Sequence, residues 1–137
     1  MVDKDLLLRR LADLDQYVEQ ASEFRTVTID QYRRDWKTQR IVERTLQMAI
    51  EACLDVANHV VADRQLRVAS TYAEIFEVLG DAGLLEQNLR EGLIRMARFR
   101  NILVHDYARI DPAVVVRILQ EHLDDFRRFR EAVLGWI

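Results

Sequence analysis

The sequence predicts an all-α protein, an antiparallel four-helix bundle with one additional short helix. Apolar residues recur at spacings of three and four over most of the 137 residues, which places them on one face of each helix. Glycine and proline, the residues that break helices, together number only five. No stretch competes seriously as a strand. Helices with one apolar face and short connections bury those faces against one another, as in a bundle.

Two helices are expected in the N-terminal half. The first runs from Asp3 to about Phe24, and its apolar stripe comprises Leu7, Leu11, Leu14, Val18 and Ala21. The β-branched stretch TVTID interrupts the pattern, and Thr28 or Asp30 can cap the helix that follows. This second helix is the longest expected and extends to about Ala62.

A polar joint, ADRQLRVAS, separates these helices from the C-terminal half. The next segment, TYAEIFEVLGDAG, reads as a short helix ended by Gly80 or Gly83, since glycine commonly terminates helices. A fourth helix is expected from about Leu85 to beyond Phe99.

The only proline opens the last expected helix. Pro112 follows Asp111, so the pair supplies an N-cap and a first helical residue, and the helix should reach about Leu134. A chain of 137 residues can bury one core but not two. We therefore expect residues 1–137 to form a single domain.

Composition narrows the classes of function. Half of the residues are hydrophobic and 31% are charged, which is typical of a folded protein. No run approaches the roughly 18 apolar residues of a membrane span, and the start, MVDKDLLLRRL, lacks the features of a signal peptide. We expect a cytoplasmic protein with no membrane partner.

The lone Cys53 excludes an internal disulfide and suggests a core position. The three histidines lack metal-ligand spacing, so we expect no metal and no cofactor.

The formal net charge of −3 does not attract nucleic acid to the molecule as a whole. RNA binding would therefore need a local basic patch. The candidates, each of which could equally be a solvated helix face, are Arg33, Arg34, Lys37 and Arg40; Arg95, Arg98 and Arg100; and Arg127, Arg128 and Arg130.

The segment RNILVHDY, residues 100–107, places polar side chains in an apolar helix. At about 100° per residue, Arg100 lies at the centre of the apolar face, and Tyr107 lies about 20° away if the helix stays regular. An unpaired arginine in such a face is costly, so a partner is expected. Glu51 and Asp55 on the second helix are candidate supporting carboxylates, unless their polar stripe faces solvent.

Asn101 and His105 share a stripe on the flank of the same face. Histidine can take and give a proton at neutral pH, and a nearby arginine can stabilise a pentacoordinate phosphate. His105 and Arg100 could therefore cleave RNA without a metal. Because one histidine cannot easily serve as both acid and base, a symmetric dimer would complete the site.

The same segment carries a resemblance to a known family. RNILVHDY matches the R-x4-H-x-Y motif of HEPN-domain proteins and specifically resembles HepT toxins, and segments 43–61 and 72–101 are also similar to that family. The resemblance implies the HEPN fold, a homodimer in which two motifs line a shared cleft, and a metal-independent ribonuclease toxin of a type II toxin–antitoxin system. It implies that Arg100 and His105 are catalytic and that Asn101 supports them.

The resemblance also implies a partner and a modification. HepT toxins are paired with an MntA-type minimal nucleotidyltransferase antitoxin, which uses ATP to transfer AMP to the motif tyrosine, here Tyr107, within a larger hetero-oligomer. Asp106 departs from the family, because many relatives have glycine there. The alternatives are a catalytically weak HEPN module that docks a nucleotidyltransferase, and a purely structural bundle with a buried pair of arginine and carboxylate.

Overall fold

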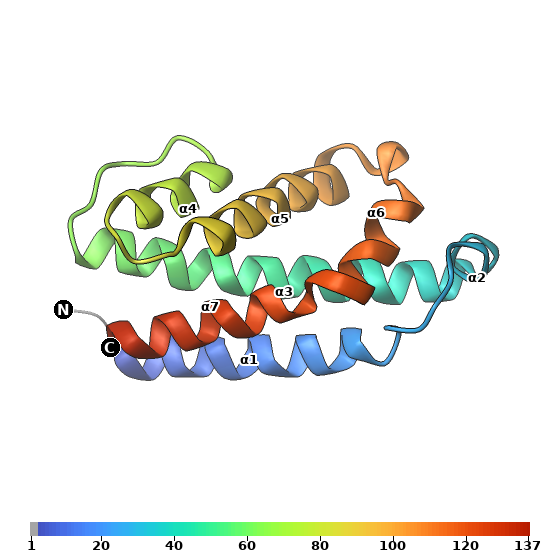
Figure 1. The fold of residues 1–137 in the computed structure, drawn as a ribbon, viewed down its shortest axis with the longest axis horizontal. Helices are drawn as coiled ribbons and strands as arrows, with labels where there is room; N and C mark the ends of the chain where they lie inside the picture. The colour runs from blue at the N-terminus through green and yellow to red at the C-terminus, as the bar shows by residue number, and fades with distance from the viewer. Residues whose placement is uncertain (1–2) are drawn as a thin grey trace.

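The computed structural model describes residues 3–137, and within this range it contains helices and turns but no strand. The elements are α1 (Lys4–Ser22), α2 (Ile29–Arg34), α3 (Trp36–Asp63), α4 (Tyr72–Asp81), α5 (Gln87–His105), η1 (Tyr107–Arg109), α6 (Pro112–Arg117), η2 (Ile118–His122) and α7 (Leu123–Trp136). The long helices α1, α3, α5 and α7 alternate in direction (Figure 1). The predicted antiparallel bundle is confirmed, and α4 is the additional short helix.

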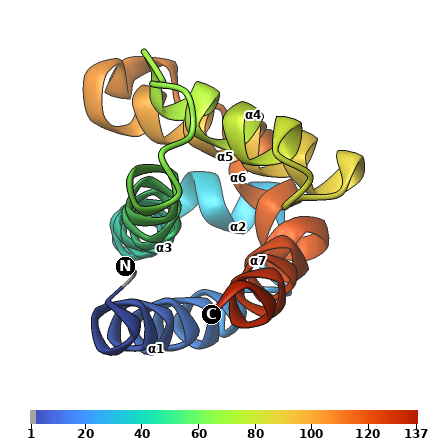
Figure 2. The same cartoon turned by 90° about the vertical axis from the view of Figure 1, so that its left-hand side faces the viewer.

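Helix α1 follows the sequence pattern closely. The Asp3 carboxylate accepts a hydrogen bond from the Leu6 N–H at 3.1 Å and caps the helix. The buried residues of α1 are the predicted stripe: Leu7, Leu11, Leu14, Val18 and Ala21. Helix α1 lies next to both α3 and α7, as the end-on view shows (Figure 2), and its stripe belongs to the shared hydrophobic core.

The helix expected next is two helices, so that prediction is wrong at its start. Thr28 caps the short α2 in a capping box with Gln31. Asp35 then leaves the helical conformation and accepts hydrogen bonds from the N–H groups of Lys37 and Thr38, which begins α3. Hydrogen bonds hold the pKa of the Asp35 carboxyl below its usual value, and the one from the Thr38 hydroxyl has the largest effect. By accepting from these two backbone N–H groups, the Asp35 side chain favours a new helix start over one continuous helix from α2 into α3.

The two candidate glycine stops behave differently. Gly83, with φ of +78°, lies just beyond α4 and ends it, as predicted. Gly80 lies inside α4, where a Cβ would be 2.0 Å from Cδ of Arg90. Gly80 therefore admits the side chain of a neighbouring helix and does not terminate its own.

The last helix begins as predicted but is not uniform. Asp111 caps α6 by accepting from the Ala113 N–H at 2.9 Å, and Pro112 occupies the first turn. A π-helical turn, η2, then separates α6 from α7. Helix α7 ends at Trp136, two residues beyond the predicted end.

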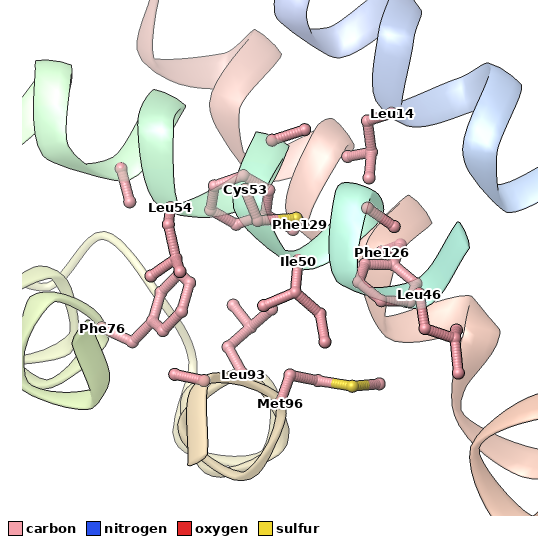
Figure 3. Packing of buried hydrophobic residues seen from close by; sticks show 14 of the residues in the cluster. Leu14, Leu46, Ile50, Cys53, Leu54, Phe76, Leu93, Met96, Phe126 and Phe129 are labelled. Atoms are coloured by element: carbon pink, nitrogen blue, oxygen red, sulfur yellow. The ribbon is translucent and has the colours of Figure 1, made fainter. Parts of the chain in front are cut away.

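One hydrophobic core joins all the long helices. In Figure 3, Cys53 lies beside Phe129, while Ile50, Leu93 and Met96 meet between α3 and α5. The predicted core position of Cys53 is confirmed, and burial raises the pKa of its thiol. The core therefore fixes α5, which carries the motif, against α3.

Gly92 sets how closely α5 approaches α7. A Cβ at this position would lie 2.5 Å from Oδ2 of Asp125, a largely buried carboxylate whose Oδ1 accepts from Arg128 at 3.3 Å. We predict that Gly92→Ala lowers the free energy of unfolding by about 1–3 kcal/mol, because the Asp125 side chain must leave its position beside Arg128 or the two helices must move apart. Urea denaturation measures the change. Gly135→Ala is the control, since nothing lies within 4 Å of its added Cβ, and this variant should be as stable as the wild type or more so.

Candidate active site

Arg100 lies in a polar contact between α5 and α3. Its side chain is 13% exposed, and Nε and Nη2 both donate to Oε2 of Glu51, at 3.0 and 2.9 Å. Nη1 donates to Oδ1 of Asn101 at 3.3 Å. A guanidinium has five N–H donors, so two remain for another acceptor. The predicted carboxylate partner of Arg100 is Glu51, and the polar stripe of α3 is not simply a solvated face.

Asp55, the other candidate partner, does not pair with Arg100. Its Oδ2 accepts from Nη2 of Arg10 at 2.7 Å, and it ties α3 to α1. The reason lies in the helical register, because Asp55 is one turn beyond Glu51 and closer to the Arg10 end of α1. Of the two candidate partners of Arg100, the structure therefore selects Glu51.

Tyr72, which the sequence did not single out, completes the surroundings of Arg100. The guanidinium carbon lies 4.8 Å from the centroid of the Tyr72 ring, a cation–π contact between α5 and α4. No short motif marks this contact in the sequence, because it joins two helices across their interface.

Asn101 and His105 line one open cavity of about 740 Å³. The other residues of its wall come from α3, α4 and the connection before α4: Leu54, Asp55, Asn58, Ala69, Ser70, Thr71, Tyr72 and Ile75. His105 is exposed, and no hydrogen bond or ion pair restrains its ring within residues 3–137. The predicted shared stripe of Asn101 and His105 therefore faces a space that a substrate can enter.

Arg100 and His105 do not share one face of α5. Arg100 points to Glu51 on α3, while His105 ends the helix on the wall of the cavity. The five-residue step between them separates their directions by about 140° on a regular helix. Convergence of the two side chains on one phosphate needs either movement of long side chains or a second subunit.

Tyr107 is not in the apolar face of α5, because the helix ends at His105 and that prediction assumed it would continue. Asp106 has a non-helical backbone (φ −143°, ψ 54°), and its carboxylate pairs with Nε of Arg109 at 3.3 Å. Tyr107 then begins the short turn η1 and is 46% exposed. The helix thus ends at this aspartate.

The Tyr107 hydroxyl instead meets a buried carboxylate on α3. Tyr107 donates to Oε1 of Glu43 at 2.5 Å, and Tyr32 of α2 donates to Oε2 of the same group at 2.8 Å. Arg40 stacks on the Tyr107 ring, with its guanidinium carbon 5.1 Å from the centroid. Figure 1 shows that the connection from α5 to α6, which contains η1, lies at the same end of the bundle as α2 and the beginning of α3.

The sequence carries a signal for the role of Glu43 in its helical spacing. Glu43 lies three and seven residues before Leu46 and Ile50, which places a carboxylate in the apolar stripe of α3. A buried acid in such a stripe indicates a specific polar partner.

The sequence around the R-x4-H-x-Y motif is similar to known proteins over most of the chain. The family described as Ribonuclease HepT-like matches residues 14–133. The chain belongs to the HepT-like family. This HepT-like chain is 36% identical over 103 residues to the mRNA nuclease HepT of Shewanella oneidensis, covering 75% of this chain and 77% of that protein. It is 26% identical over 125 residues to the tRNA nuclease HepT of Aphanizomenon flos-aquae, covering 91% and 85%.

Solved structures of HepT-like toxins share the whole fold. The tri-AMPylated HEPN toxin of Shewanella oneidensis in complex with MNT antitoxin superposes with a TM-score of 0.88 at 30% identity, over 96% of this chain and 98% of that one. A toxin–antitoxin with AMP-PNP gives a TM-score of 0.89 at 29% identity, over 96% and 99%. The resemblance inferred from the motif is confirmed at the level of family and fold.

Two further findings concern residues 3–137. No helix in this range is long and apolar enough to cross a membrane. No group of three or more His, Cys, Asp or Glu side chains in the same range is arranged to hold a metal ion.

Proposed function

We propose that this HepT-like chain is a metal-independent ribonuclease toxin that acts as a homodimer. The observation that carries the proposal is the contrast between the two motif residues. Arg100 is anchored by Glu51 with two donors to spare, and His105 is unrestrained on the wall of an open cavity. A fixed cation and an exposed histidine that is free to exchange its proton suit phosphoryl transfer once a second subunit brings such a pair together.

In the proposed reaction His105 removes the proton from a ribose 2′-hydroxyl. The 2′-oxygen forms a bond to phosphorus, the bond to the 5′-oxygen breaks, and a second histidine protonates that leaving oxygen. Arg100 donates hydrogen bonds to the phosphoryl oxygens as negative charge develops on them. Asn101, whose carbonyl accepts from Arg100, holds the arginine from the cavity side.

The proposed dimer can be tested by mixing the wild-type chain with His105→Ala. If the two His105 side chains of a dimer serve as base and acid of one site, a dimer with a single His105 is inactive. After random exchange of subunits in an equal mixture, about a quarter of the dimers carry both histidines, so the rate of RNA cleavage should be about a quarter of the wild-type rate at the same total concentration. A rate of about half, which is expected if each chain cleaves RNA by itself, would exclude a shared site.

We also propose that a nucleotidyltransferase antitoxin neutralises this toxin by transferring AMP from ATP to Tyr107. The toxin of Shewanella oneidensis is tri-AMPylated in its complex with MNT antitoxin, which supports the same chemistry here. Tyr107 is nearly half exposed and lies two residues after His105. The phosphate of an added AMP would repel the RNA backbone from the site.

We predict that Tyr107→Phe abolishes this modification. Intact mass spectrometry after incubation with the antitoxin and ATP should show added AMP units on the wild-type chain and none on Tyr107→Phe. The variant should still cleave RNA in the presence of the antitoxin and ATP. Modification of Tyr107→Phe at the wild-type rate would place the target at another residue. Tyr17→Phe, a tyrosine on α1 distant in sequence from the motif, is the matched control.

A further inference from the structure

Glu43 is an unusual residue for the inside of a helical bundle. It is 7% exposed on α3, beside the core positions Val42 and Leu46. A carboxylate buried in such surroundings is stable only with donors close to both oxygens. Its neighbours therefore explain both why it is tolerated and what it can do.

The two oxygens of Glu43 face different environments. Oε2 accepts from the hydroxyl of Tyr32, which is fully buried and belongs to α2. Oε1 accepts from the exposed Tyr107 at 2.5 Å and lies 3.6 Å from Nη1 of Arg40. One oxygen is thus fixed inside the protein, and the other holds the hydroxyl of a surface tyrosine.

This arrangement keeps the Tyr107 hydroxyl protonated before any reaction. Burial, and then the hydrogen bond and negative charge of Glu43, raise the pKa of Tyr107, while Arg40 lowers it. A neutral phenol is a weak nucleophile, so its proton must leave as a new bond to oxygen forms. Glu43 is the acceptor already within hydrogen-bonding distance of that proton.

We propose that Glu43 is the general base for transfer of AMP to Tyr107, an inference that rests on the proposed modification. The Tyr107 oxygen attacks the α-phosphorus of a nucleoside triphosphate held by the nucleotidyltransferase partner. The bond between that oxygen and the α-phosphorus forms, the bond from the α-phosphorus to the bridging oxygen breaks, and pyrophosphate leaves with the electron pair. The phenol proton passes to Oε1 of Glu43.

Arg40 allows the negatively charged phosphates of a nucleoside triphosphate to approach the Glu43 carboxylate. Its side chain is about half exposed, it stacks on the Tyr107 ring, and it lies beside Oε1 of Glu43. Its positive charge offsets the repulsion between the Glu43 carboxylate and the approaching phosphates. The toxin thus supplies both the nucleophile and the group that activates it.

The test measures the initial rate of mass increase by AMP in the purified complex with its nucleotidyltransferase and ATP. Glu43→Gln keeps the size of the side chain and one acceptor oxygen but removes the base, so the rate should fall by about 100-fold or more. Glu91→Gln changes an exposed glutamate on α5 whose hydrogen bond comes from Gln87, and it should react like the wild type. Thermal unfolding of each variant reports on folding.

Two further measurements separate proton transfer from a structural role. Replacing Tyr107 by 3,5-difluorotyrosine, a more acidic phenol, should restore most of the rate that Glu43→Gln loses. Tyr32→Phe keeps the carboxylate and removes the donor that stabilises its charge, so the rate should not fall. A Glu43→Gln rate within about twofold of the wild type, no recovery with difluorotyrosine, or a comparable loss in Tyr32→Phe would overturn the inference.

The outcomes also distinguish this inference from the proposed modification. A wild-type chain that gains no AMP overturns both proposals. A wild-type chain that is modified, together with an equally modified Glu43→Gln, overturns only the role of Glu43.

Discussion

His105→Ala is expected to lower the rate of RNA cleavage by about 100-fold or more, because it removes the proposed proton carrier. The same change should leave the free energy of unfolding within about 0.5 kcal/mol of the wild type, since His105 is exposed and has no hydrogen-bond or ion-pair partner within residues 3–137. Cleavage of a labelled RNA by the purified chain and urea denaturation measure the two quantities. Production of the variant in cells should not arrest growth.

His59→Ala is the matched control for this experiment. His59 is also an exposed histidine, but it lies on α3 outside the motif and does not line the cavity. It should retain both cleavage and toxicity. Equal toxicity of the wild-type chain and a folded His105→Ala variant would contradict the ribonuclease mechanism. Tight binding of the nucleotidyltransferase by both, with no RNA product from either, would favour the docking module instead.

Local sequence rules predicted the long helices well, because each helix buries one regular apolar stripe. They missed the start of α3, where Asp35 takes two backbone N–H groups and ends the preceding turn. A capping aspartate inside a helical pattern resembles an ordinary polar surface residue in the sequence. They also missed the π-helical turn η2, because the helical pattern of apolar residues continues through Ile118–His122 without interruption.

Features of the site that depend on one helix could be predicted from the sequence, whereas contacts between side chains of different helices could not. The position of Arg100 in the apolar face indicated a carboxylate partner, and Glu51 provides it. The choice between Glu51 and Asp55 depended on the register between α3 and α5, which the sequence of either helix does not contain. The contact of Tyr107 with Glu43 could not be predicted from the helical pattern, because it forms only when α5 ends before Tyr107, at Asp106.

Arg100→Ala is expected to affect activity and stability together, unlike His105→Ala. Loss of the guanidinium removes the proposed stabilisation of the phosphoryl oxygens, so cleavage should fall by about 100-fold or more. It also removes the donors that reach Glu51, which is 33% exposed, and the cation that packs on Tyr72. The free energy of unfolding should therefore fall by about 1–3 kcal/mol. RNA cleavage and urea denaturation measure both effects, and Arg98→Ala, an exposed arginine on the same helix, should change neither.

A second variant separates the two roles of Arg100. Adding Glu51→Ala to Arg100→Ala removes the carboxylate left without its partner, so part of the lost stability should return, whereas cleavage should not. Recovery of cleavage in this double variant would mean that Arg100 acts only by neutralising Glu51. Loss of stability without loss of cleavage in Arg100→Ala would identify a purely structural ion pair. The predicted combination requires one arginine to join α5 to α3 and to present its remaining donors to the substrate, and these two roles account for a charged side chain at the centre of an apolar helix face.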